Sequence, residues 1–326
     1  MSGAKNFFSL KGMLINSAFS LLIIVAVVYF IGIDKIAAEF GSINYFYLFL
    51  SAVFLLIMYA GMAFRLQFVL SCLGEKTRFW DVFKIHVLGM LLADFTPART
   101  GYLAVAYALS KKLKIAGEKT TVAVIGPQIY DFILKVVVGT AAMFYLVTVY
   151  LKSGHTEILF LGAFAMLGII SIMALLLFSK RFLALFFPLR KISFADKLIS
   201  IFEGAQKNSG IIIRQFPALF ALLLFTWSTK AVSWYFVAKA IGITFDPGFP
   251  EVSVYFFLQP LLTILEFIPT PTLAGLGLSE GGGVLVFSLF GIGAAKAASF
   301  VFLARIKTII INLPAVSEAL EILKPD

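Results

Sequence analysis

Residues 94–101 read DFTPARTG and interrupt an apolar region that runs from about 79 to 110. Proline removes a backbone donor and ends a helix, while glycine suits a tight turn. The stretch therefore predicts two short helices joined by a turn in which Pro97 and Gly101 are the structural residues.

A second stretch repeats this pattern in the other half of the chain. Residues 266–269 read EFIP, and their proline lies 172 residues after Pro97, within an apolar region of about 251–294. Both stretches share an acidic residue, Phe, one variable residue and Pro. We expect the structural residues of this second turn to be Pro269, Gly277 and Gly281.

The composition identifies an integral membrane protein. Of the 326 residues 61% are hydrophobic and only 13% are charged, and the mean hydropathy is +1.00. Soluble domains carry about 25% charged residues, so this chain cannot cover its surface with polar groups. A soluble enzyme, a nucleic-acid-binding domain and a transmembrane β-barrel are excluded, since the apolar runs are long and do not alternate.

Six apolar runs are long enough to predict transmembrane helices, which need about 20 residues. They are 13–33, 46–72, 120–150, 157–178, 217–241 and 296–314. Together with two re-entrant helical hairpins they predict one all-α polytopic domain over residues 1–326. Its pseudo-repeats of about 13–150 and 157–314 each contain three spans, an odd number, which gives the halves opposite orientations in the membrane.

The basic residues predict the orientation. Seventeen Lys and Arg lie in the polar segments assigned to one side, against two on the other side. By the positive-inside rule both termini are cytoplasmic, and the basic connection of about 179–216 lies on that side too. We expect a retained first span rather than a signal peptide, and a multi-pass protein of a prokaryotic plasma membrane.

Nine charged residues fall at membrane depth, where a charge is costly and normally faces a polar interior. Asp131 and Lys135, four residues apart on one helix face, line this interior or simply neutralise each other. Lys230 lies too deep in its span to reach the interface. The nine residues are Asp94, Arg99, Asp131, Lys135, Lys230, Glu266, Glu280, Arg305 and Lys307.

Arg99 is the principal candidate for anion binding. It lies in a turn just before a returning helix, where a guanidinium and free backbone N–H groups suit a phosphate. The alternative is an ion pair with Asp94. Arg305 and Lys307 point to opposite sides of one helix, and we expect Arg305 to face the cavity. Glu280 pairs with Arg305 or carries a proton.

Patterns typical of enzymes are scarce. His86 and His155 are the two histidines and Cys72 is the single cysteine, so neither a metal site nor a disulfide framework is expected. No nucleotide-binding fingerprint or nucleophile elbow is present. We therefore expect no cofactor and no catalytic residues.

Several stretches resemble the transmembrane region of lysylphosphatidylglycerol synthases. In the first half they are residues 97–101 (PARTG), residues 107–112 (YALSKK) and Asp131. In the second half they are residues 269–283 with Glu280, residues 290–292 (FGI) and Arg305. The resemblance covers nearly the whole chain, and its motifs are short.

The resemblance implies a lipid flippase module. In some bacterial relatives it is fused to a cytoplasmic aminoacyl-transferase domain and moves aminoacylated phosphatidylglycerol outward, while in some archaeal relatives it follows a glycosyltransferase that acts on dolichol phosphate. Only about 12 residues follow the last predicted span, so we expect this chain to lack the transferase domain. It is then not an enzyme itself.

The chain departs from the family pattern at three places. Tyr102 stands where Glu is common, Val105 where Arg is common, and residues 128–129 (QI) where a Glu-Arg pair is common. What the resemblance implies for Arg99, Asp131, Glu280 and Arg305 is unaffected by these differences.

The main hypothesis is translocation of an anionic lipid, either a phospholipid or a polyprenyl-phosphate-linked lipid. Its headgroup passes through a cationic cavity between the hairpins, where Arg99, Arg305 and Lys230 hold the phosphate and Glu280 or Asp131 balances charge or carries a proton. Lys135, beside Asp131, belongs to the same expected substrate-binding set. One alternative is an ion-coupled transporter of a small soluble anion. The other is an intramembrane enzyme, or a membrane scaffold or partner of a separate lipid-modifying transferase. Nucleic acid is not an expected partner.

Overall fold

A computed structural model describes residue 25, residues 28–145, residue 175 and residues 179–191, 193–207, 209–245, 250–263 and 277–323. Every element within these ranges is helical, as the sequence predicts. Four helices in these ranges are long and apolar enough to cross a membrane.

The four long helices correspond to four of the six predicted spans. They are α4 (Tyr45–Cys72), α7 (Gly117–Tyr145), α12 (Phe216–Ala240) and α15 (Ala294–Asn312). Of the other two predicted spans, 13–33 is described at residues 25 and 28–33, and 157–178 at residue 175 alone.

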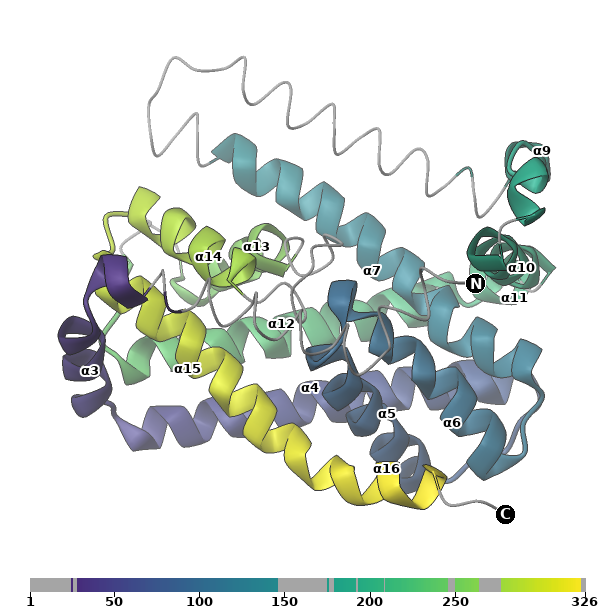
Figure 1. The fold of residues 1–326 in the computed structure, drawn as a ribbon, viewed down its shortest axis with the longest axis horizontal. Helices are drawn as coiled ribbons and strands as arrows, with labels where there is room; N and C mark the ends of the chain where they lie inside the picture. Colours follow the sequence, from purple (N-terminus) through teal and green to yellow (C-terminus); the bar gives the residue numbers. More distant parts are fainter. Residues whose placement is uncertain are drawn as a thin grey trace.

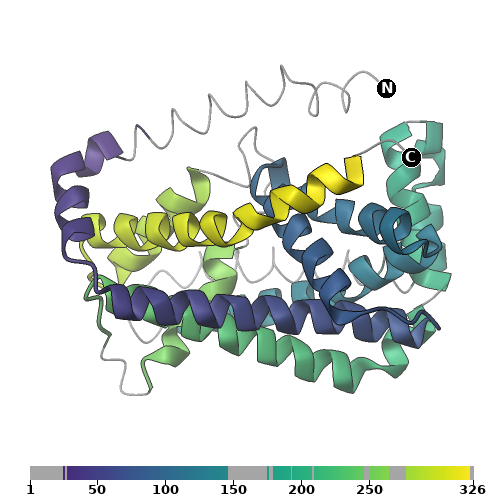
Figure 2. The same cartoon turned by 90° about the horizontal axis from the view of Figure 1, so that it is seen from below.

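The helices α4 and α12 lie side by side and antiparallel along the length of the molecule (Figures 1 and 2). Asn44 is the N-cap residue before α4, and its side-chain oxygen accepts hydrogen bonds from the amides of Phe46 (3.0 Å) and Tyr47 (3.3 Å). Such a cap satisfies two of the amides that a helix start leaves without partners. The Asn44 amide in turn donates to the carbonyl of Ala240, which joins the start of α4 to the end of α12.

One end of the described part of the molecule carries most of its basic residues. It holds the C-terminal end of α4 and the N-terminal ends of α7 and α12, and we call it the basic end. Lys119 at the start of α7 bonds Glu75 after α4 (2.6 Å). Lys112 bonds Glu318 and Glu321 there. The helices α9 (Lys180–Ala184), α10 (Ser193–Lys207) and α11 (Ser209–Arg214) lie at this end (Figure 1).

The opposite end joins the start of α4 and the end of α12 to the start of α15. Lys239 on α12 pairs with Glu251 at 2.7 Å, and Lys296 on α15 donates to the carbonyl of Gly242 at 3.4 Å. The helix α3 (Ile33–Gly41) lies at this end (Figure 1), within a segment that the sequence places between two spans.

Two pairs of short helices lie between the long ones. The first pair, α5 (Phe79–Asp94) and α6 (Ala104–Leu113), is joined by the 3-10 helix η1 (Pro97–Leu103), and it begins and ends at the basic end. The second pair, α13 (Val252–Thr263) and α14 (Leu278–Leu289), begins and ends at the opposite end. Pro269, expected in the second turn, lies outside the described residues.

The interior divides into two apolar clusters that follow this arrangement. One surrounds α5, α6 and α7 and includes Leu109 and Val122, while the other surrounds α13, α14 and α15 and includes Tyr255 and Phe300. The helix α12 contributes to both, with Leu223 in the first and Val237 in the second. Each pair of short helices therefore packs against its own half of the central helix pair.

Candidate functional site

Two adjoining cavities lie between the helices. The first has a volume of about 120 Å³ and the second about 100 Å³, each far above the roughly 10–15 Å³ that one water needs. Four described residues line both cavities, so the cavities meet in the middle of the molecule. The shared residues are Met58, Met90, Arg99 and Lys230.

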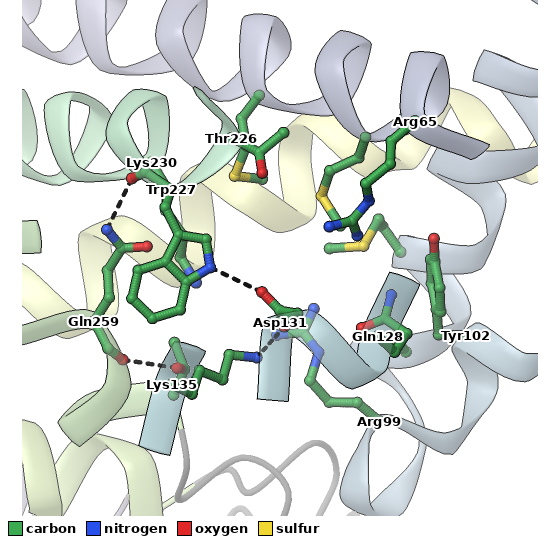
Figure 3. Close-up of a pocket in the computed structure, with 15 residues that line it drawn as sticks. Arg65, Arg99, Tyr102, Gln128, Asp131, Lys135, Thr226, Trp227, Lys230 and Gln259 are labelled. Atoms are coloured by element: carbon green, nitrogen blue, oxygen red, sulfur yellow. Dashed lines mark hydrogen bonds and ion pairs between the residues drawn. The ribbon is translucent and has the colours of Figure 1, made fainter. Parts of the chain in front are cut away.

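The first cavity is built around Asp131 on α7. Its carboxylate pairs with Lys135 one turn later at 2.7 Å and accepts a hydrogen bond from the indole N–H of Trp227 at 2.8 Å. Arg65 of α4 lines the same cavity and is only 4% exposed. Figure 3 shows Arg65 and Arg99 approaching the space around Asp131 from different elements.

The turn of the first helix pair places Arg99 between the two cavities. Its backbone φ is 55°, a left-handed conformation that is unusual for a residue other than glycine. Its guanidinium pairs with Asp94 at 3.2 Å, and Asp94 also accepts a hydrogen bond from Asn312 of α15 at 2.8 Å. The turn is thereby tied to the last long helix.

Gly101 closes this turn because no larger residue fits there. Its amide donates to the Thr96 hydroxyl at 2.6 Å, and an added Cβ would lie 2.3 Å from the carbonyl oxygen of Leu92. Next in the chain, Tyr102 lines the first cavity, and its hydroxyl lies 3.1 Å from Nδ1 of the buried His86.

In the second cavity Arg305 is bound to an acid on a neighbouring helix. Its Nε lies 2.7 Å from Glu280, whose side chain is 1% exposed. Glu280 also accepts a hydrogen bond from the amide of Gly277 at 2.6 Å, and Gly277 is the N-cap residue before α14, with a φ of 90°. One carboxylate therefore caps α14 and joins it to α15.

Lys307 lines the second cavity without an acidic partner among the described residues. Its ammonium donates to the hydroxyl oxygens of Ser51 at 2.6 Å and Ser233 at 2.8 Å. The Nζ of Lys230 lies 5.0 Å from the ring centre of Trp234, a cation–π distance. Positive charge thus continues from one cavity to the other.

Five of the six described cations that line the two cavities fall into two groups. Arg99, Lys135 and Arg305 each pair with a carboxylate. Within the part of the chain that the structure describes, Arg65 and Lys307 form no ion pair. Among the described residues the linings hold six cations and two acids, which are Arg65, Arg99, Lys135, Lys230, Arg305 and Lys307 with Asp94 and Asp131.

The structure brings most of the predicted site residues together. Arg99, Asp131, Lys135, Lys230 and Arg305 all line the cavities. Glu280 stands behind Arg305 and forms the ion pair that the sequence left as one of two alternatives. The alternative pair of Arg99 with Asp94 also forms.

Two expectations require correction. Gly281, expected in the second turn, lies within α14, and the space beside it is open. Arg305 was expected to face the cavity in place of Lys307, yet both line it. Two long side chains on one helix can reach the same space, because Arg305 extends to α14 while Lys307 extends between α4 and α12.

Arg65 is a cavity residue that the sequence analysis does not predict, although its position in an apolar run could have indicated it. It is the one charged residue in the apolar run of 46–72, where a charge is costly and normally has a role. Ser51 and Ser233 carried no comparable signal, because serine is common in membrane helices.

Comparison with known proteins decides the family. A family model for the lysylphosphatidylglycerol synthase TM region matches residues 13–315, nearly the whole chain. The chain belongs to this family. It is also similar to a UPF0104 membrane protein of Methanocaldococcus jannaschii, with 21% identity over 306 residues that cover 90% of this chain and 89% of the relative.

The family membership confirms the resemblance found in the sequence. With the four long apolar helices it identifies the chain as a multi-pass membrane protein. The family name connects that protein with lipid handling.

Proposed function

We propose that the chain translocates an anionic lipid, a phospholipid or a polyprenyl-phosphate-linked lipid, between the two membrane leaflets. The observation that carries this proposal is the excess of cations over acids in two adjoining cavities. A lipid phosphate suits such a lining, because guanidinium and ammonium groups form charge-assisted hydrogen bonds with phosphate oxygens. The lipid tails stay in the bilayer while the headgroup passes through the cavities.

The placement in the membrane follows from helix lengths. The 28 residues of α4 extend about 42 Å, which exceeds the roughly 30 Å hydrocarbon core. The 16 residues of α5 and the 12 of α13 extend about 24 Å and 18 Å, too short to cross it. We therefore interpret the two short helix pairs as re-entrant hairpins that enter from opposite sides, in an inverted repeat with six spans.

The charges support an orientation with the basic end in the cytoplasm. Among the described residues Lys111, Lys112, Lys114 and Lys119 lie at that end of the helix bundle. The positive-inside rule places such clusters on the cytoplasmic side. In this proposal both termini are cytoplasmic, in the plasma membrane of a prokaryote.

Lipid access from the side of the bundle is consistent with the outer face of the first hairpin. Trp80, Leu103 and Tyr107 expose 66%, 45% and 62% of their surface. In a membrane these side chains contact lipid. As a separate part of the proposal, a lipid-modifying transferase supplies the lipid and this chain moves it without modifying it.

The test is a transport assay in proteoliposomes that contain fluorescent phosphatidylglycerol, phosphatidic acid or polyprenyl phosphate. A membrane-impermeant quencher reports lipid that reaches the outer leaflet. We expect the wild type to expose inner-leaflet lipid faster than empty vesicles. Arg65→Gln should slow it by about tenfold to 100-fold, the value of one charged hydrogen bond of roughly 1.5–3 kcal/mol.

Arg99→Gly is a companion variant that removes a shared cation. Glycine adopts the φ of 55° at this position without strain, so the turn should keep its shape while transport falls. Arg214→Gln is the matched control, because Arg214 is exposed on α11, outside both cavity linings. Wild-type rates equal to those of empty vesicles for all three lipids would contradict the proposal, and uptake of inorganic phosphate would then test the soluble-anion alternative.

A further inference from the structure

Lys307 lies in a buried cradle made by two other helices. It is 7% exposed, and its Nζ donates to Ser51 Oγ of α4 at 2.6 Å and to Ser233 Oγ of α12 at 2.8 Å. Both serines are fully buried. Three long helices, α4, α12 and α15, thus meet at one side-chain nitrogen beside the second cavity.

The two serines are held so that both of their oxygens accept hydrogen bonds from Lys307. Ser51 Oγ donates to the carbonyl of Ser233, and Ser233 Oγ donates to the carbonyl of Ser51, each at 2.8 Å. These bonds are shorter than the 3.2 Å between the two hydroxyl oxygens. Because each hydroxyl proton points to a carbonyl, the lone pairs of both oxygens remain for the lysine.

This cradle accommodates both protonation states of the lysine. A charged ammonium carries three N–H bonds and a neutral amine carries two. Two N–H bonds satisfy the serines in either state. In the charged state the remaining position offers a donor and a positive charge, and in the neutral state it offers a lone pair.

The neighbouring charges give the ammonium no permanent counterion in the described part of the chain. Arg99 pairs with Asp94, and Arg305 pairs with Glu280, while Lys230 adds positive charge. The ionisable groups that line this cavity around Lys307 are Tyr59 of α4, Asp94 of α5, Arg99 of η1, Lys230 of α12 and Arg305 of α15, with Glu280 of α14 behind Arg305. An uncompensated buried charge is costly, so an entering anion or the loss of a proton relieves it.

We propose that Lys307 is a proton-coupled anion site. When an anionic lipid headgroup enters the second cavity, the amine takes a proton from water, and when the headgroup leaves, the ammonium returns that proton to water. No covalent bond to the lipid forms. Binding of the anion and binding of the proton favour each other equally, as linkage requires. This inference rests on the proposed function and adds its coupling to protons.

The test measures proton uptake when lipid binds. Purified protein in weakly buffered detergent receives dihexanoyl phosphatidylglycerol, a pH indicator records protons, and calorimetry records lipid binding over a series of pH values. We expect the wild type to take up about one proton per bound lipid within a limited pH window, and none well above or below it.

Three variants test whether Lys307 is the group that takes up the proton. Lys307→Arg keeps the charge but does not release its proton, so it should bind lipid with no proton uptake. Lys307→Gln, which is smaller and neutral, should also show no uptake and serves if the arginine variant does not fold. Lys296→Arg makes the same change on the same helix outside the cavity, and it should match the wild type.

The outcomes separate the two proposals. Lipid binding by the wild type without proton uptake at any pH overturns the role of Lys307. Uptake that persists in Lys307→Arg or Lys307→Gln overturns it as well, because another group then carries the proton. Failure of the wild type to bind or expose any anionic lipid overturns the proposed function itself.

Discussion

The first cavity, which Arg65 lines, and the second cavity, which Lys307 lines, have a similar arrangement of charges but use different ion pairs. Besides the shared Arg99, which pairs with Asp94, each cavity has one cation that pairs with a carboxylate and one that has no acidic partner among the described residues. In the first cavity the pair is Lys135 with Asp131, one turn apart on a single helix. In the second it is Arg305 with Glu280, on two helices.

The first ion pair is local to one helix, whereas the second depends on tertiary contact between two helices. The pair on α7 can form as soon as that helix forms, since residues four apart face the same side. The pair between α14 and α15 forms only when the second hairpin docks. We infer that Glu280 holds the second half together, whereas Asp131 mainly positions Lys135 and Trp227 at the cavity wall.

The largest expected effect comes from breaking the pair between the two helices. Glu280→Gln leaves Arg305 without its acid at a site where the glutamate is 1% exposed, which should destabilise the protein by about 3–5 kcal/mol. Thermal unfolding in detergent measures this loss. Asp131→Asn should cost less, because Asp131 and Lys135 are 16% and 11% exposed and border the first cavity.

The control for this comparison is Glu203→Gln at the exposed pair with Arg190. Surface pairs contribute at most about 1 kcal/mol, so this variant should unfold close to the wild type. Equal melting temperatures for Glu280→Gln and Glu203→Gln would show that the two cavities do not differ in the way described.

A smaller effect distinguishes the glycines of the two hairpins. Gly101→Ala places a Cβ 2.3 Å from the carbonyl oxygen of Leu92, and overpacking of this kind costs about 1–3 kcal/mol. Gly281→Ala meets no atom within 4 Å inside α14, and it should stabilise the helix by about 0.5–1 kcal/mol. The shift in unfolding temperature should therefore have opposite signs, and a shift of the same sign in both would contradict the structure.

The smallest effect concerns the contact between the first hairpin and the C-terminal helix α16 (Val316–Leu323). Burial alone would lower the pKa of Lys112, but its hydrogen bonds to Glu318 and Glu321 and their charges raise the pKa above its usual value. Because the pKa is higher in the folded state, the charged Lys112 stabilises that state fully at pH values below the ordinary lysine pKa. This stabilisation is lost as the pH rises through the pKa of Lys112 in the folded protein. That window lies above about pH 10.4.

The measurement is the melting temperature between neutral pH and about pH 11, compared with Lys112→Met. The wild type should exceed the variant at neutral pH, and the two should converge at the alkaline end. A difference that stays constant over this range would mean that packing of the side chain, not its charge, holds α16.

Much of the fold could be predicted from periodicity and composition. The four long described helices match predicted spans, since about 20 apolar residues specify a membrane helix almost alone. The first turn follows from Pro97 and Gly101, and the structure places η1 there. The prediction that Gly281 lies in the second turn was wrong, because a glycine-rich sequence does not show which of its glycines belong to the helix that follows.

The site was only partly predictable. Asp131 and Lys135 share a helix face by sequence spacing alone, so their pair could be foreseen. Arg305 and Lys307 are two residues apart, and the angle between them on a helix predicts opposite directions. That argument ignores side-chain length and the neighbours on each side, which bring both groups to one cavity.

The sequence by itself determined that the chain is an all-helical membrane protein of this family, with charges buried where only a polar cavity tolerates them. The tertiary structure decided which of those charges acquire acidic partners. Ser51, Ser233 and Lys307 meet although 182 and 74 residues separate them. Such contacts depend on how helices pack against one another, and neither composition nor spacing along one helix records that.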